Sequence, residues 1–90
     1  MIDIAVFRVY GTPNGRFLAY ADVLLGGAML LREVRIIQAD PITDDPMVRM
    51  PARRLADGTW VEYYHPMNRL TRVALEDAVR AAYKAHVGVA

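Results

Sequence analysis

The chain has 90 residues, with eleven basic and ten acidic side chains and no cysteine. Its length predicts a single domain over residues 1–90, and the lack of cysteine excludes disulfides, thiolate zinc sites and cysteine nucleophiles. The net charge of +1 excludes a polycation of the histone-tail type, although it leaves local charged patches open.

Turn signals recur at short intervals through the first two thirds of the chain. Asn14-Gly15 separates Ile2–Tyr10 from Arg16–Leu25 and predicts a hairpin with a type I′ turn, which needs positive φ at both central residues. Gly26-Gly27 and Asp57-Gly58 predict two further hairpins. These hairpins indicate strands that run antiparallel to their neighbours in sequence.

The connection between the third and fourth predicted strands has a different composition. It runs over Ala39–Pro46 with two prolines and three aspartates, and we expect a loop because proline lacks the N–H that a strand ladder uses. The remaining strands are expected over Leu30–Gln38, Met47–Leu55 and Thr59–His65, which gives a five-stranded antiparallel meander. Apolar residues on both faces of Leu30–Gln38 predict a cover on each face, one by a helix and one by a partner. An apolar content of 54 % in so small a domain likewise predicts a homo-oligomer.

The last third of the chain changes to a helical period. Pro66 disfavours helix in the residue before it, and Asn68 fits the N-cap of a helix over Arg69–Val87, with Gly88 at its end. The spacing of a core-facing helix face is followed by Leu75, Ala78, Val79, Ala82 and Tyr83. The predicted class is therefore α+β, an antiparallel β-meander followed by a C-terminal α-helix.

The sequence offers no constellation of catalytic residues. The chain has no serine, which excludes serine-nucleophile hydrolases, and Gly26-Gly27 lies between two strands, whereas a phosphate-binding loop leads into a helix. We therefore expect no enzymatic activity, no catalytic residues, no cofactor and no small-molecule substrate. A metal-dependent enzyme that uses His65 and the aspartates of Ala39–Pro46 is the weakest alternative.

The acidic loop and the two histidines have simple structural explanations. Asp40, Asp44 and Asp45 lack the spacing of a calcium loop and its bidentate glutamate, so we expect a solvated loop and no metal site. His86 is expected to interact favourably with the dipole at the end of the helix. A structural turn into the helix is expected at His65, Pro66 and Asn68.

The hydrophobic pattern does not predict a membrane protein. The longest apolar run, Val23–Leu31, has nine residues and two glycines, whereas a membrane-spanning helix needs roughly 20 residues. Asp3 stands where a signal peptide carries positive charge. We expect a cytoplasmic protein with no membrane partner.

The basic residues are mostly arginine, and their placement is uneven. Between Arg49 and Arg72 there are five arginines and two acids, and the pair Arg53-Arg54 leads toward a hairpin turn. Guanidinium groups match phosphate oxygens and stack on bases, and exposed aromatic rings nearby would also stack with bases. Such rings are available on the next strand at Trp60, Tyr63 and Tyr64. The segment is thus typical of a nucleic-acid-binding surface, while a protein-interaction module with an exposed sheet edge and merely solubilising arginines remains the alternative.

Several short motifs resemble the stage V sporulation protein G (SpoVG) family of septation regulators. Met50-Pro51-Ala52-Arg53-Arg54 is similar to the family's Met-Pro-Ser-Lys-Arg segment, and His65-Pro66-Met67-Asn68 to its His-Pro-Ile-Asn segment. Arg32-Glu33-Val34-Arg35-Ile36-Ile37 resembles a family strand, and Asn14-Gly15-Arg16 a family hairpin. The motifs occur in the family's order, and the resemblance runs from about residue 4 to residue 86.

The resemblance implies a five-stranded antiparallel sheet with a C-terminal helix and a homodimer formed by strand association. It also implies a regulator of septation or sporulation that binds DNA or RNA. The basic pair implicated in nucleic-acid contact corresponds to Arg53 and Arg54, and Arg72 matches a basic position in the opening turn of the helix. Arg49 stands where the family has a small residue and adds positive charge. The expected nucleic-acid-binding residues are Arg49, Arg53, Arg54 and Arg72.

Overall fold

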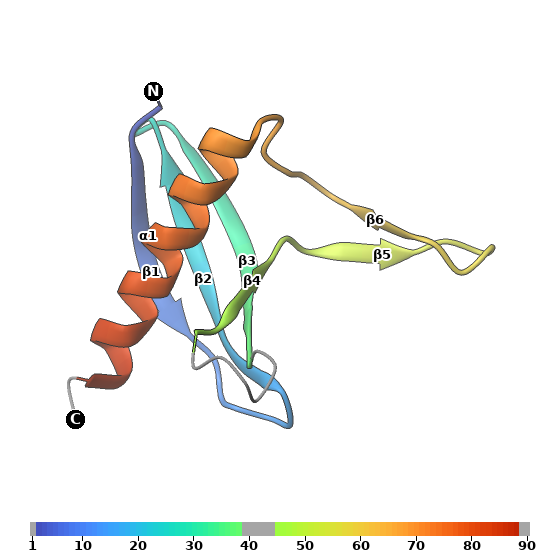
Figure 1. The fold of residues 1–90 in the computed structure, drawn as a ribbon, viewed down its shortest axis with the longest axis horizontal. Coiled ribbons are helices and arrows are strands. Elements are labelled where there is room, and N and C mark those ends of the chain that lie inside the picture. Colours follow the sequence, from blue (N-terminus) through green and yellow to red (C-terminus); the bar gives the residue numbers. More distant parts are fainter. Residues whose placement is uncertain (1, 39–44, 89–90) are drawn as a thin grey trace.

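An antiparallel sheet of four strands, crossed by one long helix, makes up the body of the molecule (Figure 1). The structure is a computed structural model that describes residues 2–38 and 45–88. The four-stranded sheet has the order β1-β2-β3-β4, and β5 and β6 pair in a separate two-stranded sheet. The elements are β1 (Ile4–Tyr10), β2 (Phe17–Leu25), β3 (Met29–Ile37), β4 (Met47–Arg49), β5 (Ala52–Arg54), β6 (Trp60–Glu62) and α1 (Arg69–Gly88). The α+β class and the antiparallel order of the first strands are as predicted.

The fourth predicted strand, Met47–Leu55, is divided in two, so the expected five-stranded meander is wrong. Its first part is β4, which pairs with β3, and its second part is β5, which pairs with β6. The break falls at Pro51, which has no N–H to continue the ladder. Residues 52–62, called the arm below, consequently project away from the body as a hairpin of their own (Figure 1).

The first hairpin turn differs in type from the prediction. Asn14 and Phe17 exchange two backbone hydrogen bonds of 3.0 Å, so Gly15 and Arg16 are the central residues of the turn. Gly15 has φ of 61°, but Arg16 is not among the residues with positive φ. A single positive φ at the first central position is typical of a type II′ turn, so the predicted type I′ turn is wrong. The second predicted hairpin does have two glycines with positive φ, at Gly26-Gly27.

The helix begins after Asn68, whose side-chain oxygen accepts a hydrogen bond of 2.8 Å from the backbone N–H of Thr71. This bond satisfies one of the N–H groups that have no partner within the helix. The helix ends at Gly88, one residue beyond the predicted end. Leu75 and Val79 are fully buried against one face of the sheet. The buried core there also contains Ala19, Ala21, Val23, Val34, Ile36, Val48 and Met50.

One charged residue, Asp22 in the middle of β2, is almost completely buried. Its Oδ2 accepts a hydrogen bond of 2.8 Å from Arg8 Nε, and its Oδ1 accepts bonds of 3.0 Å from the Tyr10 hydroxyl and 3.2 Å from the Glu33 N–H. The register shifts next to this carboxylate in both neighbouring pairings, and Glu33 has a φ of 63°. The carboxylate therefore accepts hydrogen bonds at two irregular places in the sheet, one near Arg8 in β1 and one at Glu33 in β3.

Candidate nucleic-acid interface

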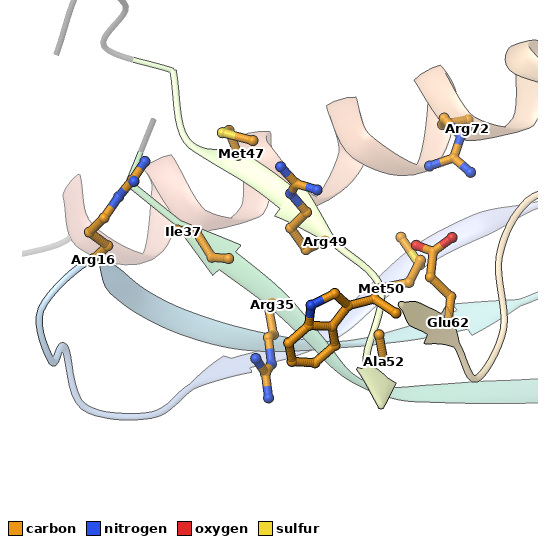
Figure 2. A pocket seen from close by; sticks show the side chains of 10 residues that line it. Arg16, Arg35, Ile37, Met47, Arg49, Met50, Ala52, Glu62 and Arg72 are labelled. Carbon is orange, nitrogen blue, oxygen red and sulfur yellow. The ribbon is translucent and has the colours of Figure 1, made fainter. Parts of the chain in front are cut away.

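Four arginines from separate parts of the chain line one hollow, which has a volume of about 680 Å³. Arg35 on β3 is the direct ladder partner of Arg49 on β4. Arg16 comes from the first hairpin turn, where it also donates a hydrogen bond of 3.2 Å to the backbone carbonyl of Gln38. Arg72 reaches the hollow from the opening turn of α1 (Figure 2). The fold thus gathers onto one surface charges that are up to 56 positions apart in sequence.

The charges in this hollow are not balanced within the described part of the chain. Among the described residues, ion pairs involve Arg8, Arg80 and Lys84. None of the four arginines of the hollow takes part in one. One acid, Glu62, also lines the hollow, without coming within ion-pair distance of them. Like charges directly opposite each other on neighbouring strands are destabilising. Four arginines beside one acid give the hollow an excess of positive charge, which attracts anions.

The two faces of the arm differ. In the β5–β6 ladder, Arg54 is the partner of Trp60, and Arg53 is the partner of Val61. Because successive pairs point to opposite faces of a ladder, Arg54 and Trp60 share one face and Arg53 lies on the other. Trp60, like Ala52 and Glu62 on the same face, lines the hollow. Arg54 therefore lies on the hollow side of the arm, whereas Arg53 points away from it.

The structure separates the four residues that the sequence singled out. Arg49 and Arg72 lie together in the hollow, while Arg53 and Arg54 are exposed on opposite faces of the arm. Sequence reasoning missed Arg16 and Arg35 as parts of the same surface. The signal for them is tertiary, because the pairing of Arg35 with Arg49 depends on the register between β3 and β4.

The turn into the helix contains the other predicted site residues. The Nδ1 atom of His65 lies 3.1 Å from the carbonyl oxygen of Pro66, and Asn68 occupies the N-cap. Just before this turn, the hydroxyl of Tyr64 donates a hydrogen bond to the carbonyl of Arg32 on β3. Burial raises the pKa of Tyr64 to about 12. The Tyr64 bond ties the segment that follows the arm to β3, shortly before α1 begins.

The residues considered for a cation site do not form one in the described part of the chain. Asp45 accepts a hydrogen bond of 2.7 Å from Lys84, and this bond lowers the pKa of the carboxyl below its ordinary value. Asp40 and Asp44 lie outside the described residues. Over residues 2–38 and 45–88, no three histidine or carboxylate side chains form a group that could hold a metal ion.

Within residues 2–38 and 45–88, no helix combines the length and the apolar character that a membrane span requires.

The chain is similar to a recognised family over nearly its whole length. The family model described as SpoVG matches residues 1–85. A relative from Archaeoglobus fulgidus, named "Putative septation protein SpoVG", is 31 % identical over 85 residues, which cover 93 % of this chain and 96 % of the relative. A relative of the same name from Bdellovibrio bacteriovorus is 30 % identical, with coverage of 92 % and 74 %. A Listeria monocytogenes relative, named with the suffix SpoVG 1, is 31 % identical, with coverage of 91 % and 76 %. The motifs, the fold and these similarities together show that the chain belongs to the SpoVG family of septation proteins.

Proposed function

We propose that this chain is a non-enzymatic regulator of septation or related gene expression that binds the phosphates of DNA or RNA through its arginines. One observation carries the proposal: Arg35 and Arg49 are direct partners in the β3–β4 ladder, and both line a hollow that Arg16 and Arg72 also line. Such an arrangement costs stability in the free chain, and bound anions would relieve the cost. Arg54 extends this basic surface along the hollow side of the arm, and Arg53 adds a further positive charge on the opposite face of the arm.

The chemistry of the guanidinium group suits this role. It is planar, always charged and presents N–H groups in a fork that matches two phosphate oxygens at once. Each phosphate that an arginine neutralises releases condensed counterions, so binding weakens as salt is added. Contacts of this kind position a nucleic acid without reading its sequence. The surface therefore supports binding to many sequences in preference to one operator.

A second copy of the chain is the other partner in this proposal. The arm consists of two strands of three residues each, and an isolated two-stranded hairpin is marginally stable in water. Val61 in the arm and Tyr63 directly after it are 42 % and 66 % accessible in the single chain. Association of strands between two copies would bury this apolar surface and double the number of phosphate contacts.

The test is the salt dependence of binding to labelled oligonucleotides, followed by fluorescence polarisation. Replacing Arg35 and Arg49 together by glutamine should reduce the slope of log K against log salt by about 1.4 for a single strand, since each phosphate contact contributes about 0.7. Lys84→Gln is the matched control, because it removes a positive charge that lies outside the hollow and pairs with Asp45. It should leave the slope unchanged.

Two results would contradict the proposal. If the parent chain does not bind oligonucleotides at low salt, the edge strand β1, with Phe7 62 % exposed, becomes the candidate surface of a protein-interaction module. If the chain binds but the double variant keeps the full slope, phosphates contact another surface. Sedimentation analysis of the parent chain tests the dimer independently, and a monomer at micromolar concentration would refute that part.

A further inference from the structure

Trp60 occupies an unusual position for the single tryptophan of the chain. It lines the arginine hollow, yet it is 67 % exposed and does not belong to the buried core. Large aromatic side chains usually contribute most of their area to a core or to an interface. An indole held in water next to four arginines is therefore available to a ligand.

The rest of the lining combines charge with apolar surface. Besides the four arginines and Glu62, apolar side chains contribute to the walls, namely Ile37, Met47, Met50 and Ala52. Phosphate groups need the guanidinium groups but gain nothing from apolar walls, whereas the face of a nucleobase gains from both an indole and apolar contacts. The hollow thus offers complementary surface to both parts of a nucleotide.

We infer that the hollow takes single-stranded nucleic acid, with one unstacked base on the Trp60 indole and neighbouring phosphates on Arg35, Arg49 and Arg72. This inference rests on the proposed function and specifies its ligand. In a duplex the base faces are covered by their neighbours in the stack, so a stacking side chain finds no partner there. In a single strand the base faces are accessible, and basic grooves with aromatic side chains are the usual means of holding them.

The size and the placement of the hollow fit the same ligand. Its volume of about 680 Å³ lies within the range of about 300–1,000 Å³ that is typical of sites for small ligands, so it accommodates a nucleotide-sized part of a strand. Arg54 shares the face of Trp60, which extends the basic lining along the arm and allows the strand to continue there. Arg53 lies on the other face and has no part in this site.

The first measurement uses the parent chain, in which Trp60 is the single tryptophan and therefore the source of all tryptophan fluorescence. Adding a single-stranded oligonucleotide should quench this emission as a base stacks on the indole. A duplex of the same length, bound at a concentration that gives the same polarisation, should leave the emission largely unchanged. Because this experiment needs no substitution, it does not depend on the folding of a variant.

The second measurement compares variants by polarisation. Trp60→Ala should weaken binding to the single strand by about 5- to 150-fold, the range measured for loss of one base–aromatic stack, and change duplex binding by less than about twofold. Trp60→Phe should retain part of the affinity, since a smaller ring still stacks. Phe7→Ala is the matched control, because Phe7 on β1 is an aromatic side chain of similar exposure, 62 %, that does not line the hollow. Its affinity for the single strand should stay within about twofold of the parent.

The outcomes separate the failure of this inference from the failure of the proposed function. No binding of either nucleic acid at low salt would overturn both. Binding without quenching, or equal losses for single strand and duplex in Trp60→Ala, would overturn the stacking role and leave phosphate binding intact. A changed sedimentation coefficient of Trp60→Ala would assign the indole to contact between copies of the chain, and would likewise overturn the inference.

Discussion

Replacing Asp22 by alanine should lower the free energy of unfolding by about 3 kcal/mol, because one buried carboxylate serves three donors in the sheet. The alanine side chain accepts no hydrogen bond, so the N–H of Glu33 and the hydroxyl of Tyr10 lose their partner. Asp22→Asn is the milder change. Its side-chain oxygen is able to keep the bonds from Tyr10 and Glu33, while its amide group faces Arg8.

The magnitude follows from the environment of each donor. A hydrogen bond to a charged group contributes about 1.5–3 kcal/mol, but the Arg8 side chain is 56 % exposed and is able to turn to water when the carboxylate is lost. The bond from Arg8 therefore contributes little, and most of the loss comes from Tyr10 and Glu33. We expect about 3 kcal/mol for alanine and about 1–2 kcal/mol for asparagine. In a domain of this size, 3 kcal/mol corresponds to a decrease in Tm of about 12–24 °C.

Urea unfolding followed by circular dichroism measures these differences, and Asp77→Ala is the control. Asp77 is 69 % exposed and contacts Arg80 at 3.4 Å, so its loss should cost less than about 0.5 kcal/mol. If Asp22→Ala and Asp22→Asn both unfold within about 0.5 kcal/mol of the parent, the carboxylate does not stabilise the irregular part of the sheet. Equal losses for the two variants would show that the charge matters and the hydrogen-bond acceptors do not.

The pH dependence of stability gives a separate check on Asp22. Burial raises the pKa of Asp22, but the hydrogen bonds from Arg8, the Glu33 N–H and Tyr10 outweigh it, so the pKa lies below the ordinary 3.8. A lowered pKa in the folded state means that the stabilisation is present above about pH 4 and is lost as the pH falls through the folded value. Asp22→Asn should therefore lose less stability than the parent on acidification below pH 4.

Three further predictions concern other contacts in the fold. Asn68→Ala should lower the free energy of unfolding by about 1 kcal/mol, because alanine removes the N-cap acceptor of the Thr71 N–H. Asn68→Ser keeps an acceptor and should stay close to the parent, so equal values for the two variants in urea unfolding would refute the cap. Glu33→Gly should raise the melting temperature by a few degrees, since glycine tolerates a φ of 63° and the left-handed conformation costs other residues about 1–2 kcal/mol. The control Glu33→Ala keeps this cost and should not raise the melting temperature. Tyr64 should ionise near pH 12 in an ultraviolet titration. Its raised pKa means that the stability it contributes is lost as the pH rises above about 10, and a curve of stability against pH identical to that of Tyr64→Phe would contradict this.

Local signals in the sequence were sufficient for the helix and for the hairpins. Asn68, the apolar stripe with Leu75 and Val79, and the paired glycines Gly26-Gly27 each act within a few residues, and the structure has a cap, a buried face and a turn at these places. The division of Met47–Leu55 could not be read in the same way. Pro51 is a local signal for the break, but the different partners of the two halves, β3 and β6, are set by tertiary structure.

The candidate site was predictable only in part, because it is assembled by tertiary structure. Arg49 and Arg72 were identified from local charge and from the family resemblance, and they do line the hollow. Arg35 was not, since its position opposite Arg49 depends on the register between β3 and β4. The different orientations of Arg53 and Arg54 required the register of the arm as well.

The opposed pair Arg35 and Arg49 has a consequence for the response of the protein to ionic strength. Dissolved ions screen the repulsion among the like charges of this hollow, so added salt stabilises the free chain at this site. The same ions compete with the arginines for phosphates and weaken the proposed complex. Folding and ligand binding therefore respond to salt with opposite signs at one pair of side chains. A melting temperature that rises with salt in the free chain and falls with salt in the complex would be the thermal signature of this coupling.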